Sequence, residues 1–163
     1  MSELYLMIGC PGAGKSTFLK NHVGNGVVVS RDNIRFSFPI DQNNYFAYED
    51  KVLIMFYDEI NKNLKEGRNV FVDQTSLTPK ARKELLKHLW NYDAVNAIWI
   101  DEPLEICLER NEKRQGTKAY VPRNVICKMY HRLVPPSLDE GFKRIFRYNS
   151  KENKLTYIEE KIT

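Results

Sequence analysis

The sequence predicts an α/β fold: a three-layer α/β/α sandwich with a parallel sheet of four or five strands and a helical lid. Strand-like apolar runs alternate with helical patterns along the chain, and a glycine-rich loop joins the first strand to the first helix. The 163 residues are 42% hydrophobic and 28% charged. Such a chain buries a core without disulfides or structural metal, so we expect one domain over residues 1–163.

The first half of the chain predicts three strands and two helices. The runs 4–8, 27–29 and 70–72 are short and continuously apolar, which is typical of strands buried on both faces. A helix from Lys15 to about Val23 is closed by Gly24, where left-handed backbone is needed. A longer helix is expected from about Tyr45 to Glu66. Its apolar stripe consists of Phe46, Leu53, Phe56, Ile60 and Leu64.

The second half predicts three helices and two strands. Thr78 has the chemistry of a helix N-cap, with Pro79 at the first helical position. The buried face of that helix is expected to comprise Ala81, Leu85, Leu86 and Leu89. Further helices begin at Pro103 and near Pro122, and strands are expected at 94–100 and 145–148, whereas the segment 155–163 is ambiguous.

Composition excludes several classes of protein. The three cysteines fit no zinc spacing, and neither a secretory leader nor a membrane span is recognisable, so we expect reduced thiols and a cytoplasmic location. The net charge is +4, yet the segment 110–132 alone carries +6, from seven basic residues and one acidic residue. A solvated helix face is the ordinary explanation of such a run, and a polyanionic partner is the alternative.

The segment from Gly9 to Ser16 matches the phosphate-binding pattern G-x-x-x-x-G-K-[ST], directly after a strand and before a helix. Glycines let backbone N–H groups converge on phosphate, and the helix N-terminus adds positive potential. Lys15 is expected to bridge the β- and γ-phosphates of ATP or another NTP, and Ser16 to hold Mg²⁺. The expected nucleotide-binding residues here are Gly9, Gly12, Ala13, Gly14, Lys15, Ser16 and Thr17.

Two carboxylates follow strands of the predicted sheet. The carboxyl ends of the strands face the nucleotide, which places Asp32 and Asp73 near the phosphates. Asp32 can accept the proton of an attacking hydroxyl, although a turn or capping aspartate is an equally common role. Asp73 can assist in binding the Mg²⁺ ion or can orient a neighbouring side chain.

Two arginines and a group of aromatic residues are further candidates. Arg110 and Arg114 are four residues apart on one predicted helix, so they can project together over a triphosphate, or they can simply favour the helix C-terminus. Near Arg31 and Arg35, rings beside cations are typical of single-stranded nucleic acid binding. We assign Phe46 to the core and leave Phe36 and Tyr45 open between core and stacking.

These motifs together resemble the 5′-kinase domain of bacteriophage polynucleotide 5′-kinase/3′-phosphatase. The resemblance extends to about residue 133 and rests on segments 8–17, 31–35, 77–79 and 110–118, on Asp73, and on Met129-Tyr130. It implies transfer of the γ-phosphate of ATP to the 5′-hydroxyl end of single-stranded RNA or DNA. It also implies that Asp32 is the general base, that Arg35 contacts the acceptor with Arg31 nearby, and that Asp73 supports Arg35.

The same resemblance assigns Arg110 and Arg114 to a lid at about residues 110–122 that closes over the phosphates, with Arg114 in a catalytic role. The sequence departs from the family at Asn33, where a second aspartate is usual, and at Gln115 and Tyr120, which look like insertions. No D-x-D-x-[TV] motif follows, so 3′-phosphatase activity is not expected. A small-molecule or nucleoside monophosphate kinase and a non-catalytic nucleotide-binding switch are the competing functions.

Overall fold

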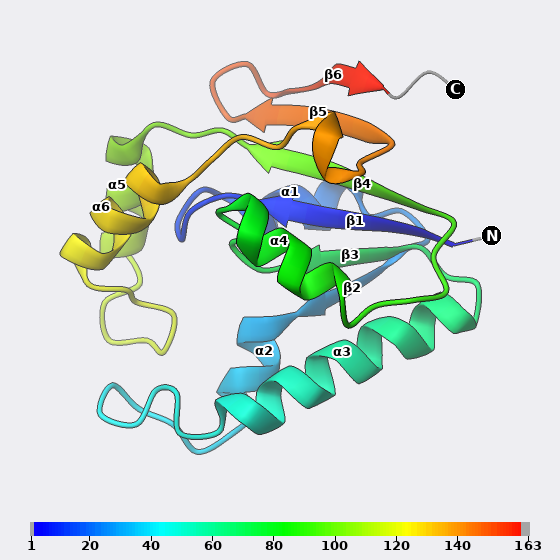
Figure 1. The fold of residues 1–163 in the computed structure, drawn as a ribbon. Helices are drawn as coiled ribbons and strands as arrows, with labels where there is room; N and C mark the ends of the chain where they lie inside the picture. The colour runs from blue at the N-terminus through cyan, green and yellow to red at the C-terminus, as the bar shows by residue number, and fades with distance from the viewer. Residues whose placement is uncertain (1, 161–163) are drawn as a thin grey trace.

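Six strands form one sheet in the order β2-β3-β1-β4-β5-β6, in a computed structural model that describes residues 2–160. The strands are β1 (Glu3–Ile8), β2 (Val27–Ser30), β3 (Val70–Asp73), β4 (Ala94–Ile100), β5 (Arg144–Asn149) and β6 (Lys154–Glu160). The pairs among β1 to β5 are parallel, and β6 pairs antiparallel with β5 at one edge. Figure 1 shows the parallel strands ending on the same side of the molecule.

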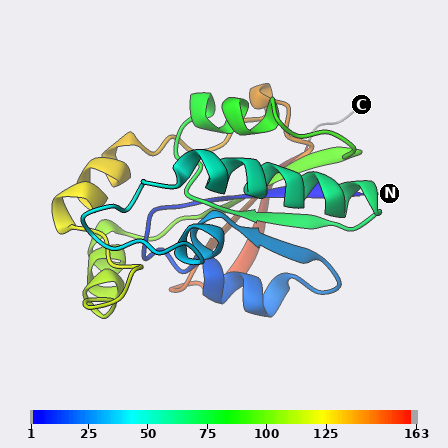
Figure 2. The same ribbon diagram turned by 90° about the horizontal axis from the view of Figure 1, so that it is seen from below.

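Helices cover both faces of the sheet. They are α1 (Lys15–His22), α2 (Arg31–Phe36), α3 (Glu49–Lys65), α4 (Pro79–Leu86), α5 (Leu104–Glu112), α6 (Arg123–Arg132) and a single 3₁₀ turn, η1 (Leu138–Glu140). Seen from below, α1 lies on one side of the sheet, and α3 and α4 lie on the other (Figure 2). The three-layer arrangement agrees with the predicted fold class. Within the described residues, none of these helices has both the length and the apolar character that a membrane span requires.

The alternation of side chains along β1 explains why both faces are covered. Leu4, Leu6 and Ile8 point into one core cluster, which includes Phe56 of α3 and is built on the α3 and α4 side. Met7 points into a second cluster with Phe18 of α1. Every one of these β1 side chains is fully buried, as the continuous apolar run predicts.

Several predicted features are confirmed by the structure. β4 spans Ala94–Ile100, and the Thr78 hydroxyl accepts a hydrogen bond from the Ala81 backbone N–H at 3.1 Å, which caps α4 directly before Pro79. The ambiguous segment after Leu155 contributes to β6 up to residue 160, and residues 161–163 lie outside the described part. The sheet therefore has six strands, and the edge strand β6 runs antiparallel to its neighbour β5.

Two predictions about buried faces are wrong. α3 begins at Glu49, because the chain from Tyr45 to Tyr48 forms turns, and Phe46 leaves the predicted stripe and is 66% exposed. In α4, Ala81 is exposed and Arg82 is buried instead. Every nitrogen of the Arg82 guanidinium has a hydrogen-bond partner within the protein: the group pairs with Glu140 and donates to the carbonyls of Ser76 and Val134, so an arginine can occupy a core position.

Candidate active site

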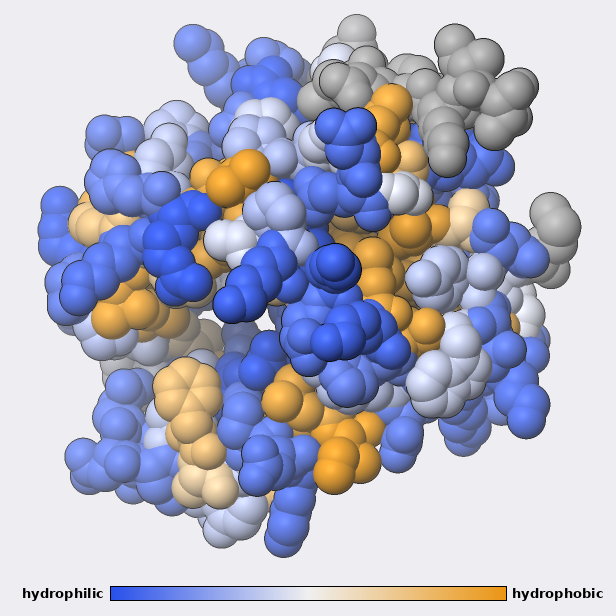
Figure 3. Space-filling view, in the orientation of Figure 1, coloured by the Kyte–Doolittle hydropathy of each residue, from blue (hydrophilic) through white to orange (hydrophobic). Residues whose placement is uncertain are grey.

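One cavity of about 640 Å³ lies at the carboxyl ends of the parallel strands. Figure 3 shows a deep hollow at this end of the molecule. The glycine-rich loop and the start of α1 supply Pro11, Gly12, Lys15 and Ser16, and the ends of β2 and β3 supply Ser30, Arg31, Asp32 and Asp73. Residues after β3, from α2, from the loop that follows α2, from the α5–α6 connection and from α6 complete the lining. The structure thus brings Lys15, Ser16 and the expected acceptor residues to one cavity, whereas Gly9, Ala13, Gly14, Thr17 and Arg110 are not among its lining residues.

The glycine-rich loop has the backbone that phosphate binding requires. Gly12 and Gly14 have positive φ angles of 83° and 98°, and Gly14 is the N-cap of α1. The loop is anchored at its start by the Gly9 N–H, which donates to the Thr75 carbonyl at 3.0 Å, and inside by the Ala13 N–H, which donates to Cys10. Thr17 is exposed on the first turn of α1.

The rear of this loop packs against α5. A Cβ placed on Gly12 would lie 2.4 Å from the Cys107 carbonyl oxygen, which is too close for any side chain at that position. Cys10 and Cys107 are both buried there, and burial raises the pKa of the Cys10 thiol to about 12. Both thiols are free and neutral, so they act as packing groups rather than nucleophiles.

The side of the cavity next to the glycine-rich loop, called the phosphate side below, has three polar side chains at its centre: Lys15, Ser16 and Asp73. The Lys15 ammonium donates to the carbonyls of Gly9 and Cys10 at 2.9 Å each. Burial lowers the pKa of Lys15, and the Asp73 carboxylate offsets part of that change. Burial also raises the pKa of Asp73, with Lys15 opposing. Asp73 accepts a hydrogen bond from the Ser16 hydroxyl at 3.3 Å. A hydroxyl and a carboxylate at this separation are hard oxygen donors of the kind that Mg²⁺ binds.

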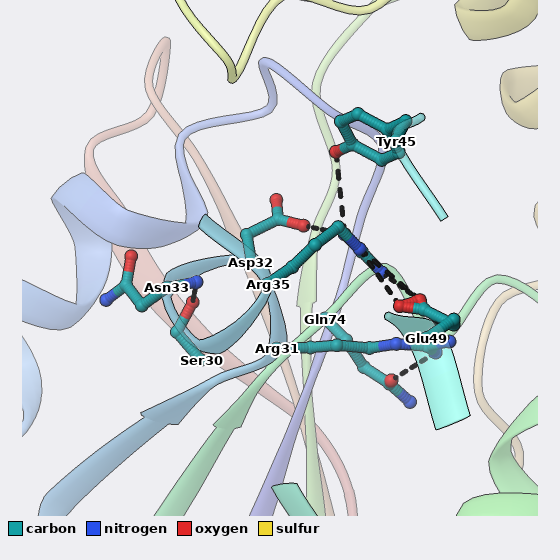
Figure 4. Close-up of polar contacts among 8 residues, drawn as sticks. All are labelled: Ser30, Arg31, Asp32, Asn33, Arg35, Tyr45, Glu49 and Gln74. Atoms are coloured by element: carbon teal, nitrogen blue, oxygen red, sulfur yellow. Dashed lines mark hydrogen bonds and ion pairs between the residues drawn. The ribbon is translucent and has the colours of Figure 1, made fainter. Parts of the chain in front are cut away.

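The side of the cavity where the sequence places an acceptor, called the acceptor side below, is built on the short helix α2. Ser30 caps this helix by accepting from the Asn33 N–H at 3.2 Å, so the capping role belongs to Ser30 and not to Asp32. Asp32 in the first turn is 60% exposed and accepts from Arg35 at 2.5 Å through one carboxylate oxygen. The close-up in Figure 4 shows its other oxygen directed away from Arg35. Asp32 lines the cavity, and the oxygen that Arg35 does not engage is available to accept a proton.

Glu49, at the start of α3, is a site residue that the sequence did not indicate. Its carboxylate receives two N–H groups of Arg35, at 3.0 and 2.9 Å, and lies 3.5 Å from Arg31 (Figure 4). Arg31 also donates to Gln74 at 3.3 Å. Glu49 follows Arg35 by fourteen positions, and only the packing of α2 against α3 brings them together. No local sequence pattern marks such a pair.

The expected support of Arg35 by Asp73 is replaced by a different arrangement. Within residues 2–160, the hydrogen-bond partners of the Arg35 guanidinium are Asp32, Glu49 and the Tyr45 hydroxyl. Asp73 instead contacts Ser16 on the phosphate side. Arg35 is only 6% exposed, so its guanidinium is held in one orientation by two carboxylates.

The two arginines of the predicted lid do not project together. α5 ends at Glu112, and Arg114 lies in the following turn, where its backbone N–H donates to the Asn111 carbonyl at 2.9 Å. Arg110 donates to the carbonyl of Ala13 at 2.8 Å and so fixes the glycine-rich loop from outside. Of these two arginines, only Arg114 lines the cavity. Its positive charge contributes a small lowering of the pKa of Lys15 and of Asp73.

The loop between α5 and α6, residues 113–122, is closed by a buried asparagine. The Asn111 side chain is fully buried, donates to the Val121 carbonyl at 2.6 Å and accepts from the Val121 N–H at 3.0 Å. These two bonds pair the side chain with a peptide group, as a neighbouring strand would. At the loop tip, Lys118 donates to the carbonyl of Phe36 at 3.3 Å. The α5–α6 loop therefore bridges from the phosphate side to α2.

Comparisons with known proteins identify a family and several similar proteins. The AAA_33 family, described as an AAA domain, matches residues 4–136. The protein named "Transcription factor bHLH140" of Arabidopsis thaliana is 31% identical over 144 residues, which cover 86% of this chain and 15% of that protein. The "Putative bifunctional polynucleotide phosphatase/kinase" of Acanthamoeba polyphaga mimivirus is 28% identical over 152 residues, 88% of this chain and 32% of that protein.

A solved structure, that of the Pnkp1/Rnl/Hen1 RNA repair complex, contains a chain with a TM-score of 0.67 and 25% identity, covering 81% of this chain and 44% of the other. The chain thus spans less than a third of the length of the two curated relatives and under half of the structural one. With most of its length matched by the family and a glycine-rich phosphate loop between β1 and α1, the chain belongs to the AAA_33 family and has a nucleotide-binding P-loop kinase fold.

Proposed function

We propose that this protein is a polynucleotide 5′-hydroxyl kinase, which transfers the γ-phosphate of ATP or another NTP to the 5′-hydroxyl end of single-stranded RNA or DNA. One observation carries the proposal: a single cavity is lined both by the phosphate loop and by Asp32, an exposed carboxylate oriented by Arg35. A switch protein needs the first group only, whereas a phosphotransferase needs both.

The reaction requires few groups from the protein. The acceptor oxygen forms a bond to the γ-phosphorus, the bond from that phosphorus to the β–γ bridging oxygen breaks, and its electron pair leaves with ADP. The acceptor proton passes to the free carboxylate oxygen of Asp32, while Arg35 holds the other oxygen. Arg114 and Lys15 offset the negative charge on the transferring phosphoryl group.

The donor side is proposed to take a nucleotide triphosphate with Mg²⁺. Lys15 lines the cavity from the start of α1, and a bound phosphate would favour its charged form, which burial disfavours. The Ser16 hydroxyl would ligate Mg²⁺ with Asp73 beside it, and the bound ion would neutralise phosphate charge. Arg110 contributes by holding the loop backbone at Ala13.

Three observations favour a polynucleotide over a small molecule. The viral relative and the solved RNA repair complex both carry polynucleotide-related names. The basic segment 110–132 contains the α5–α6 loop, which reaches α2 at the edge of the cavity. Two acceptor-side arginines, Arg31 and Arg35, line the cavity beside Asp32 and suit the phosphates of a strand. We accordingly assign Arg31 and Arg35 to acceptor binding and keep Asp73 on the phosphate side with Ser16.

An acceptor screen tests the proposal. The protein is incubated with γ-labelled ATP, Mg²⁺ and either 5′-hydroxyl RNA and DNA oligonucleotides of matched sequence or a set of nucleosides, nucleoside monophosphates and small sugars. Label on the oligonucleotides is the expected result. Label on small molecules alone would overturn the polynucleotide assignment in favour of a small-molecule kinase on the same fold.

Asp32→Asn tests the chemistry within the same assay. The variant keeps the size and the hydrogen bond to Arg35 but cannot take a proton, so transfer should fall by about 10²- to 10⁴-fold with ATP affinity retained. Asp50→Asn, on the exposed first turn of α3, is the matched control. Unchanged transfer in Asp32→Asn would remove Asp32 as the general base.

A further inference from the structure

Phe46 is exposed inside the cavity. At 66% it is the most exposed of the large apolar side chains in the described part of the chain, and it lines the same cavity as Asp32 and Lys15. A large ring left open on a convex surface is common, but an open ring within a concave site is a contact surface for a ligand.

The ring is held in place without being buried. The Arg35 guanidinium carbon lies 5.4 Å from the Phe46 ring centroid, and the Tyr45 ring packs edge-on at 4.8 Å with an interplanar angle of 80°. Arg35 is itself fixed by Glu49 and Asp32. One side of Phe46 therefore rests on a rigid support, while most of its surface remains available.

The cavity lining contains further apolar or aromatic side chains besides Phe46. The α5–α6 loop and α6 supply Tyr120, Val125 and Met129. Val125 is 37% exposed, although its position on α6 suggests a buried face. These side chains offer surface for a flat, weakly polar group, beside the polar residues that also line the cavity.

We propose that Phe46 is the stacking platform for the nucleobase of the acceptor's 5′-terminal nucleotide. The inference rests on the proposed function and adds a base-binding residue to it. Asp32 and Phe46 contact the same guanidinium, that of Arg35, so a hydroxyl at Asp32 and a base on Phe46 fit within one nucleotide. Stacking on a ring accepts any base, so the site should prefer nucleotides over base-free acceptors without strong sequence selection.

The test uses 5′-hydroxyl oligonucleotides whose 5′-terminal nucleotide either carries a base or is abasic. Phe46→Leu should raise the KM for the base-containing acceptor about tenfold, since base–aromatic stacking is typically of that strength. It should leave kcat within about twofold and the abasic acceptor unaffected. Phe46→Tyr, which keeps the ring, should restore the wild-type KM. Ile54→Ala, at a 61% exposed position on α3, is the control for loss of an exposed apolar side chain.

The outcomes separate the two proposals. If the wild type phosphorylates oligonucleotides but Phe46→Leu changes KM equally for both acceptors, or for neither, the stacking platform is wrong and the kinase assignment stands. If the wild type transfers phosphate to no oligonucleotide, both proposals are overturned.

Discussion

The two sides of the cavity are built in different ways. The phosphate side is shaped mainly by backbone: the φ angles of Gly12 and Gly14, and hydrogen bonds among main-chain groups between residues 9 and 18. The side chains of Lys15 and Arg110 add hydrogen bonds to carbonyls of the same loop. The acceptor side is shaped by side chains from α2, α3 and the α5–α6 loop, joined through Arg35, Glu49 and Asn111. Backbone geometry is set by a few consecutive residues, whereas side-chain geometry depends on how distant segments pack. The two sides should therefore respond differently to mutation.

Gly12→Ala should have the largest effect. The new Cβ would meet the Cys107 carbonyl oxygen at 2.4 Å, and an L-residue at a φ of +83° is strained. We expect a loss of about 3 kcal/mol in the free energy of unfolding together with loss of ATP binding, because the loop must shift away from α5. Denaturant unfolding and nucleotide titration measure the two effects.

Gly24→Ala is the matched control for Gly12→Ala. Gly24 also has a positive φ, of +57°, but a Cβ there meets nothing within 4 Å. Only the conformational cost of about 1 kcal/mol is expected, with ATP binding unchanged. Similar losses in the two variants would show that the contact with α5 does not shape the phosphate loop.

Asn111→Ala tests the acceptor side and should have an intermediate effect. It removes both side-chain bonds to Val121 and frees the α5–α6 loop, which carries Arg114 into the cavity. We expect transfer to fall about tenfold or more through kcat, with a smaller change in ATP affinity, because the phosphate loop keeps its own backbone bonds. Steady-state kinetics with an oligonucleotide acceptor separate the two parameters.

Two further variants define the origin of the Asn111 effect. Asn111→Asp keeps the acceptor for the Val121 N–H but loses the donor to its carbonyl, and it should be no better than alanine because a buried carboxylate then faces a carbonyl. Gln115→Ala changes an exposed residue of the same loop and should behave as wild type. A uniform decrease in ATP affinity across the Asn111 variants would instead place the effect on the phosphate side.

The same contrast explains what the sequence could predict. The phosphate loop, the Thr78 cap and the strand 94–100 depend on neighbours within a few residues, and each is found in the expected place. Phe46 was misassigned because the turn from Tyr45 to Tyr48 precedes the helix, so helical periodicity does not apply to it. A similar error placed Arg114 on the same helix as Arg110, although α5 ends at Glu112.

The missed residues share a different cause. Glu49 holds Arg35, Asn111 holds Val121 and Lys118 reaches Phe36, and the first and last of these contacts join separate elements of the fold. The edge strand β6 depends likewise on pairing with β5. One-dimensional patterns give the type of side chain at each position, but not which distant group it meets.

Asp73→Asn should have the smallest effect and the opposite sign for stability. Burial raises the pKa of Asp73, so the folded state binds a proton more tightly than the unfolded state, and ionisation of Asp73 costs stability once the pH exceeds the unfolded value of 3.8. Asparagine avoids that cost. Asp73→Asn should therefore raise the free energy of unfolding near neutral pH by less than about 1 kcal/mol, seen as a slightly higher Tm, and the gain should vanish as the pH falls below about 4.

Asp58→Asn, on the exposed face of α3, corrects for the change in net charge. A gain that persists at low pH would show that packing, and not desolvation of the carboxylate, is responsible. Because the amide lacks the negative charge that Asp73 places beside Ser16 and the proposed Mg²⁺ site, the same variant should transfer phosphate more slowly, which would identify Asp73 as a carboxylate kept at the phosphate side for function at a cost in stability.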